Sequence, residues 1–115
     1  MLNENHYISN IRQDLLFRVG RCAKENTKLI SEASPDDLWF HLDGFPSAHV
    51  LITPPSHLKK KQILSLCKRG AEICRRYTNA CLDKTRTPVC YTAVKNLTLL
   101  DKPGGVKLGM HKILH

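Results

Sequence analysis

The stretch that most constrains the fold runs from residue 37 to residue 50 and reads DLWFHLDGFPSAHV. Apolar and mixed residues alternate along its first half, which is typical of a β-strand with one face toward a core. The apolar face would carry Leu38, Phe40 and Leu42, and the other face Trp39, His41 and Asp43. Residues 44–47 contain turn-forming Gly and Pro, and a second strand is expected over residues 49–53. The pattern therefore predicts a β-hairpin whose second face carries an aromatic ring, an imidazole and a carboxylate.

Hydrophobic periodicity predicts the remaining elements. They are a strand over 15–19, a helix over 23–33, a long helix over 57–82 capped by Ser56, a strand over 89–95 and a short strand over 110–114. Residues 1–14 show no clear period and are expected to form an N-terminal arm, either loose or a helical lead-in, before a single domain over 15–115. Because strands outnumber helices and the connections permit antiparallel neighbours, the predicted fold is α+β. We expect an antiparallel sheet of about four to five strands with one long and one short helix packed on it.

The cysteines do not form a metal or disulfide pattern. Five is an odd number, which fits a reducing compartment better than a disulfide framework. Cys67, Cys74 and Cys81 recur every seven residues, so on a helix they would lie about 10.5 Å apart along one face. That separation is too long for a disulfide or for one tetrahedral metal ion. We expect small core side chains, no metal and no cofactor.

Charge indicates the class of partner. Eighteen Lys and Arg against ten Asp and Glu give a net charge of +8. Such a balance favours a polyanion, meaning nucleic acid, the ribosome or an anionic membrane surface, although a basic protein without such a partner fits the charge as well. No apolar run approaches the ~20 residues that span a bilayer. The first residues lack the charged and apolar regions of a signal peptide, so a cytoplasmic protein without a membrane partner is expected.

Four segments in the same order resemble one family. They are residues 37–50, VGRCAKEN at 19–26, VCYTAVK at 89–95 and KPGGVKLG at 102–109. Together they resemble the NFACT-R domain, the RNA-binding module of the ribosome-quality-control factors of the NFACT family and of small stand-alone eukaryotic relatives. The resemblance covers roughly residues 15–112. Cys22 stands where the family usually has Asn, and Thr27 where it often has Asp. The chain ends at His115, before a final strand that many members have, and has no room for the further domains of the large members.

The resemblance implies a non-catalytic RNA-binding domain in a setting linked to tRNA or ribosomal RNA. Ribosome or quality-control proteins would then be possible partners. It does not imply elongation of stalled peptides, because the parts that hold the ribosome in large members are missing. Two alternatives stay open. One is a general nucleic-acid adaptor that binds DNA. The other, less favoured, is a metal-dependent hydrolase built from His41, Asp43, His49 and Cys90. The RNA, the protein partners and the oligomeric state do not follow from the sequence.

Residue chemistry and the resemblance together give a set of candidate contacts. Aromatic rings can stack on unpaired bases, and His, Lys and Arg can contact phosphate. The candidate nucleic-acid-binding residues are Arg21, Lys24, Asn26, His41, Asp43, Ser47, His49, Lys59, Lys60, Lys61, Tyr91, Lys95, Lys102 and Lys107. Tyr91 and Lys95 are expected beside His41 on a neighbouring strand, and the loop from Lys102 to Lys107 is basic enough to close over a backbone.

Three of these expectations depend on burial. Trp39 could stack on a base, but packing under the helix that begins at Ala23 is the preferred interpretation. Residues 59–61 place three lysines against the positive end of a helix dipole, so either the helix starts later or the lysines attract an anion. If phosphate lies near His41 and His49, it should raise both pKa values, and binding would strengthen as the pH falls from about 7.5 to 6.

Overall fold

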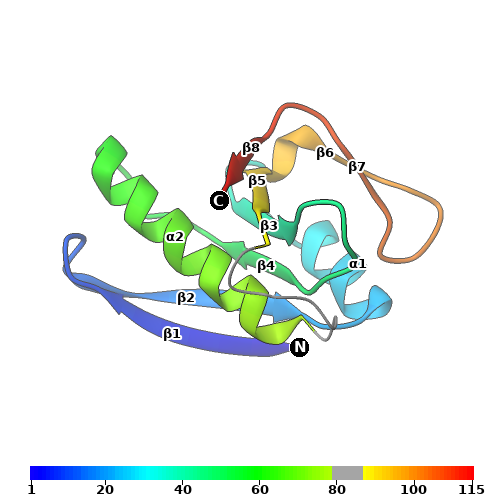
Figure 1. Ribbon diagram of the computed structural model, residues 1–115, viewed down its shortest axis with the longest axis horizontal. Coiled ribbons are helices and arrows are strands. Elements are labelled where there is room, and N and C mark those ends of the chain that lie inside the picture. The colour runs from blue at the N-terminus through cyan, green and yellow to red at the C-terminus, as the bar shows by residue number, and fades with distance from the viewer. Residues whose placement is uncertain (79–86) are drawn as a thin grey trace.

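A six-stranded antiparallel sheet forms the centre of the computed structural model, which describes residues 1–78 and 87–115 (Figure 1). Its strand order is β1-β2-β4-β3-β5-β8. The bounds are β1 Leu2–Ile8, β2 Gln13–Gly20, β3 Leu38–Leu42, β4 His49–Ile52, β5 Val89–Ala93 and β8 Lys112–Leu114. A separate hairpin pairs β6 (Leu97–Leu99) with β7 (Val106–Leu108). The predicted α+β class is confirmed, and the main sheet has slightly more strands than expected.

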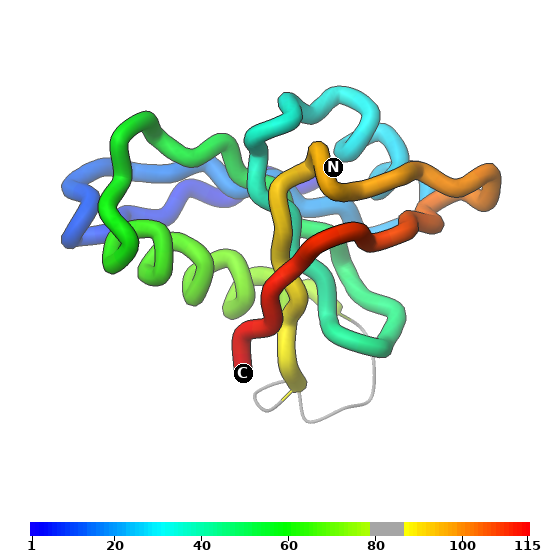
Figure 2. Tube along the Cα trace, turned by 90° about the horizontal axis from the view of Figure 1, so that it is seen from above, coloured from blue at the N-terminus to red at the C-terminus, as the bar shows by residue number. Residues whose placement is uncertain are grey.

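Two helices cover opposite faces of the sheet (Figure 2). Helix α2 (Lys60–Tyr77) packs over a cluster of buried side chains that includes Phe17, Phe40 and Leu66. Helix α1 (Ala23–Ser31) covers a second cluster on the other face, and a single 3-10 turn, η1 (Val94–Asn96), follows β5. Among the described residues no helix is both long and apolar enough to cross a bilayer.

Strand β3 has the alternation that its sequence predicts. It pairs with β4 to form the expected hairpin, with Trp39 opposite Leu51 and Phe40 opposite Val50. Phe40 belongs to the α2-side cluster and Trp39 to the α1-side cluster. Trp39 is 1% exposed and packs with Leu29 of α1. The packing interpretation of Trp39 is therefore confirmed.

The N-terminal segment is not an arm, and that prediction is wrong. Strand β1 pairs with β2 along its whole length, from Leu2 opposite Val19 to Ile8 opposite Gln13. Alternate β1 side chains are partly buried, but two of them are the polar residues Glu4 and His6. Helix α2 supplies their partners: Glu4 accepts hydrogen bonds from Arg76 and Tyr77, and His6 bonds Arg69. Polar residues on the inward face hid the period of two from the sequence.

Helix α2 starts later than predicted. Ser56 is not its cap, because His57 has a φ of 63° and so lies in the left-handed region, which a helix cannot include. Lys59 is the N-cap residue, and its N–H donates to the Gln62 side chain at 2.8 Å. The predicted end at Leu82 lies outside the described residues.

The cysteines behave as core residues where they can be described. Cys67 and Cys74 are free, buried thiols on the face of α2 that meets the sheet. Burial raises the pKa of Cys67 to about 11 and that of Cys74 to about 12, so neither forms a thiolate at neutral pH. Cys81 lies outside the described residues.

Helix α2 approaches β3 so closely that only glycine fits at residue 70. A Cβ there would lie 2.6 Å from the Phe40 ring. Alanine normally stabilises a helix interior by ~1 kcal/mol over glycine, but overpacking a core costs ~1–3 kcal/mol. Gly70→Ala should therefore lower the free energy of unfolding in urea titrations. Lys68→Ala, on the exposed side of the same helix, should change it by less than ~0.5 kcal/mol. A Gly70→Ala protein more stable than the parent would contradict this packing.

Candidate nucleic-acid interface

A groove of about 330 Å³ lies between the β3–β4 turn and the β6–β7 hairpin. We call it the histidine groove. Its sheet side is lined by Trp39, His41, Leu42, Asp43, Gly44, Phe45, Pro46, His49 and Cys90, and its hairpin side by Gly104, Val106 and Leu108. The sequence-predicted residues His41, Asp43 and His49 thus do come together in one place.

Three rings are held in a fixed arrangement at the base of this groove. The Trp39 indole Nε1–H donates to Nδ1 of His49 at 3.1 Å. His41 stacks on Trp39 with ring centroids 5.4 Å apart and planes 13° apart. His41 and His49 meet edge to face, with centroids 4.9 Å apart. His41 Nδ1 lies 2.6 Å from the Leu42 carbonyl oxygen, to which it can donate when protonated at that nitrogen. Each ring is therefore fixed by at least one polar contact and one aromatic contact.

Burial favours the neutral form of both imidazoles. It lowers the pKa of His49 to about 3, and the neighbouring His41 lowers it as well. Burial also lowers the pKa of His41, while the Leu42 carbonyl and Asp43 partly oppose that shift. In the neutral forms, His49 Nδ1 is an acceptor, and His41 has its proton on Nδ1 and an acceptor at Nε2. A phosphate that raised these pKa values, as the expected strengthening of binding at pH 6 requires, would have to overcome this burial, and that pH dependence stays a prediction.

His49 is a packing residue in this structure. It is 3% exposed, and its ring holds the indole of Trp39. Its burial disfavours the predicted direct contact between His49 and a ligand, which stays a prediction. Ser47 also has structural bonds, because its hydroxyl accepts the Leu42 N–H at 3.0 Å and donates to the Ala48 carbonyl at 2.8 Å. His41 and Asp43, which are half-buried, are the polar side chains left facing the groove.

The β6–β7 hairpin brings the start of α1 to the rim of the groove. The Gly104 N–H donates to the Thr27 hydroxyl at 2.7 Å. Gly104 has a φ of 75°, and a Cβ on it would lie 2.9 Å from the Ala23 Cα, so glycine is needed there on both counts. Lys102, in the same loop, and Lys24, in the first turn of α1, are both exposed. The rim of the groove therefore carries exposed lysines, whereas its base combines imidazoles whose neutral form is favoured with the Asp43 carboxylate.

The turn before α1 is less open to anions than predicted. Glu25 lies in the first turn of the helix, where its carboxylate accepts the Arg21 N–H at 3.0 Å and pairs with the ammonium of Met1. These bonds lower the Glu25 pKa, so the carboxylate stays charged. The Arg21 side chain is exposed. Asn26 is buried, and its Oδ1 has no hydrogen-bond partner and lies against Gly20, so it is not a surface contact.

Several predicted residues lie away from the groove. Tyr91 is the cross-strand partner of Phe40 and stacks on its ring. Its side chain therefore lies on the α2 face of the sheet, whereas that of His41 lies on the α1 face. The expectation that Tyr91 lies beside His41 is therefore wrong; Cys90 holds that position. Lys95 belongs to η1 rather than to a strand, and its ammonium pairs with Asp36 at 3.1 Å. Lys107 is exposed, and its two neighbours in β7, Val106 and Leu108, line the groove. Because side chains alternate along a strand, Lys107 faces away from the groove.

The lysines at 59–61 form a separate basic surface. Figures 1 and 2 both place the start of α2 at the end of the molecule away from the β6–β7 hairpin. Lys60 and Lys61 lie in the first turn of the helix, which contains no acidic residue. The helix does start later than expected, which is one of the two explanations offered by the sequence. Lys60 and Lys61 still oppose the helix dipole, and their attraction of an anion stays a prediction.

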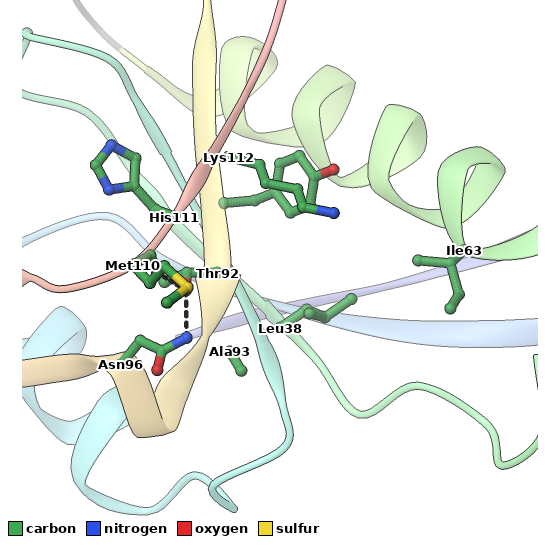
Figure 3. Close-up of a pocket in the computed structure, with 9 residues that line it drawn as sticks. Leu38, Ile63, Thr92, Ala93, Asn96, Met110, His111 and Lys112 are labelled. Atoms are coloured by element: carbon green, nitrogen blue, oxygen red, sulfur yellow. Dashed lines mark hydrogen bonds between the residues drawn. The ribbon is translucent and has the colours of Figure 1, made fainter. Parts of the chain in front are cut away.

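A second groove of about 340 Å³ lies on the α2 side of the sheet, beside β5 and β8 (Figure 3). Figure 3 shows Ile63 of α2 on one side of it and Met110, Asn96 and Lys112 on the other. The Asn96 side-chain amide donates to the Thr92 hydroxyl at 3.0 Å. Tyr91 lines this groove rather than the histidine groove.

Phe45 is the main site residue that the sequence did not single out. It lies in the β3–β4 turn, lines the histidine groove, and is 46% exposed. The signal that could have identified it is an aromatic residue in a short turn between two apolar strands. No three His, Cys, Asp or Glu side chains within residues 1–78 and 87–115 lie close enough to hold a metal ion.

The fold, though not the sequence, has a known counterpart. No protein-family model matches the sequence, and no curated protein matches it either. One solved structure similar to this chain is the C-terminal part of the fibronectin/fibrinogen-binding protein from Streptococcus suis. It aligns with a TM-score of 0.75 and 24% identity over 97% of this chain. The chain spans 44% of that structure, and at this identity the likeness shows a shared fold alone.

The burial of His49 predicts a loss of stability in mild acid. The pKa of His49 is lowered from 6.5 to about 3 in the folded protein. Above pH 6.5 the residue is neutral in both the folded and the unfolded chain, so its contribution to the free energy of unfolding is complete. That contribution falls as the pH drops from about 6.5 toward 3, by about 1.4 kcal/mol for each pH unit. Asparagine can accept the Trp39 bond but cannot take up a proton in this range. Between pH 6.5 and 5, the parent should therefore lose about 2 kcal/mol more unfolding free energy than His49→Asn.

A second variant separates protonation from the hydrogen bond. His49→Leu leaves the buried Trp39 N–H without an acceptor, which costs ~1–3 kcal/mol at pH 7.5. His49→Asn should be the more stable of the two at that pH. Parallel loss of stability by the parent and His49→Asn in acid would show that His49 is not held neutral by burial.

Proposed function

We propose that this chain is a non-catalytic RNA-binding domain that holds an unpaired base in the histidine groove. The observation that carries this proposal is an aromatic groove whose imidazoles favour the neutral form, with exposed lysine and arginine side chains at its rim. Phe45 offers an exposed ring at the edge of the groove, and His41 offers a neutral ring nitrogen inside it. Sequence-specific RNA recognition commonly uses aromatic stacking and hydrogen bonds to unpaired bases.

The phosphate backbone would follow the rim. Arg21, Lys24 and Lys102 are exposed around the contact between α1 and the hairpin loop. The net charge of +8 favours a polyanion at long range, and these three cations would contact it at short range. The setting of tRNA or ribosomal RNA in the cytoplasm comes from the resemblance to NFACT-R, which also motivates the absence of catalysis.

Competition experiments distinguish this function from its rivals. Structured RNA with unpaired loops should displace a labelled single-stranded RNA, whereas duplex DNA of equal length should not. Stronger competition by duplex DNA would favour the general nucleic-acid adaptor instead. A stoichiometric divalent metal in the purified protein would favour the metal-dependent hydrolase.

Phe45 should contribute to RNA affinity without contributing to the fold. Stacking on an aromatic side chain is worth ~1–3 kcal/mol per base, so Phe45→Ala should weaken binding of single-stranded RNA by about fivefold to more than a hundredfold. Its exposure predicts a nearly unchanged melting temperature. Leu64→Ala, an equally exposed apolar residue on α2, is the matched control for fluorescence anisotropy. Equal affinities of the two variants for RNA would contradict the stacking of a base on Phe45 in this groove.

The cations at the rim should set the dependence on salt. Three phosphate contacts to single-stranded RNA give a log–log slope of about −2, and Lys102→Glu should weaken binding and make that slope shallower by about 0.7. Lys60→Glu makes the same charge change on the separate basic surface and should alter affinity much less. A larger effect of Lys60→Glu would place the RNA along the start of α2 and would contradict the groove proposal.

A further inference from the structure

Strand β1 is an open edge of the main sheet. It is the first strand in the order β1-β2-β4-β3-β5-β8, and in the described part of the chain it pairs only with β2. Figure 1 shows it as a long strand along the lower border of the molecule, with no other element beyond it. It has seven residues, whereas β8 at the opposite edge has three. An edge strand of this length presents a row of unpaired N–H and C=O groups to any extended chain.

The outward side of this edge carries none of the lysine, proline or bulges with which proteins commonly guard an edge strand. Its one charged side chain, Glu4, points inward and is paired with Arg76. The sequence of β1, LNENHYI, contains no Lys, Arg, Pro or Gly, although the chain as a whole has eighteen Lys and Arg. β8 by contrast includes Lys112. The outward-facing β1 residues Asn3, Asn5 and Tyr7 are exposed and uncharged.

Charge near this edge is nearly balanced. The only carboxylate of β1, Glu4, pairs with Arg76 at 3.0 Å, and Arg69 pairs with Glu72 at 3.3 Å. Two copies that each carry a net charge of +8 repel one another over most of their surfaces. The β1 edge is a place where that repulsion is small.

The sequence of β1 is complementary to itself when reversed about Asn5. An antiparallel pair with Asn5 opposite Asn5 of a second copy would put Leu2 opposite Ile8, Asn3 opposite Tyr7 and Glu4 opposite His6. The end residues then meet as apolar pairs, and the central pairs combine an acid with a base. Cross-strand pairs of these kinds stabilise antiparallel sheets.

We propose that β1 binds β1 of a second copy of this chain in antiparallel register about Asn5. The two main sheets then join into one continuous sheet related by a twofold axis. The histidine groove is built on β3, β4 and the β6–β7 hairpin, so this interface leaves both grooves open. The pairing rests on the β1 edge alone and does not depend on what the groove binds.

Disulfide trapping tests the register. Directly opposed residues of antiparallel strands have Cα atoms ~4.5–5.5 Å apart, within the span of a disulfide. Asn5→Cys, in a Cys22→Ser background, should therefore form a cross-linked dimer under mild oxidation. Asn3→Cys is the matched control, because the two copies of residue 3 are offset by four residues, ~13 Å along the strand. Peptide mapping should find residue 5 joined to residue 5.

Two results would overturn the proposal. One is an Asn5→Cys protein that stays monomeric under oxidation, or cross-links no faster than Asn3→Cys. The other is a parent chain that remains monomeric in sedimentation equilibrium at high concentration. The parent should show a monomer–dimer equilibrium that Asn5→Lys weakens at least tenfold, since it opposes two like charges at the axis. Thr98→Lys, on the exposed side of β6, is the control and should leave the equilibrium unchanged. Equal effects of Asn5→Lys and Thr98→Lys would mean that the net charge of the chain, and not the β1 edge, controls association.

Discussion

The Trp39 side chain is fully buried on the α1 side of the sheet, and its indole N–H must find an acceptor inside the protein. His49 supplies that acceptor from the neighbouring strand, where it is the diagonal neighbour of Trp39. This bond adds a side-chain link between the paired strands β3 and β4, and it fixes the ring that packs with Leu29 of α1 and on which His41 stacks. It also requires an unprotonated Nδ1 on His49. The chemistry at the base of the groove is therefore decided by the packing of a core tryptophan.

A groove base without a favoured cation, and with the Asp43 carboxylate, changes how the phosphates and bases of a nucleic acid would be divided over the surface. Phosphate is poorly matched to a half-buried site with no cation, whereas a base edge offers both donors and acceptors to a neutral imidazole. Phosphates are better accommodated at the exposed rim, where lysine and arginine side chains keep their hydration. The close approach of Gly104 to Ala23 makes this division possible, because it brings the basic start of α1 and the basic hairpin loop to the same side of the groove.

The sequence predicted the elements whose apolar residues carry the period. The alternation of β3, the pairing with β4 and the packing of Trp39 follow from residues 37–53, and the stripe on α2 follows from its 3.6-residue spacing. Strand β1 was missed because Glu4 and His6 occupy inward positions, and their partners on α2 are more than sixty residues away in the chain. Tyr91 was assigned to the wrong face because a shift of one residue in strand register exchanges the two faces, and neither strand contains a feature that fixes the register. The neutrality of His49 could not be predicted either, since a histidine's pKa depends on burial that only the assembled sheet provides.

The two edges of the main sheet differ in a way that follows from the chain's path. At the β8 edge the pairing with β5 covers only three residues, and the Thr92 hydroxyl bonds the Met110 carbonyl just before β8 begins. At the β1 edge pairing continues over seven residues with no such interruption. The outward residues of β1 are all uncharged, while the inward Glu4 and His6 are held by Arg69, Arg76 and Tyr77 of α2. In a chain with a net charge of +8, this side of the border would therefore oppose the approach of a second copy less than a row of lysines would.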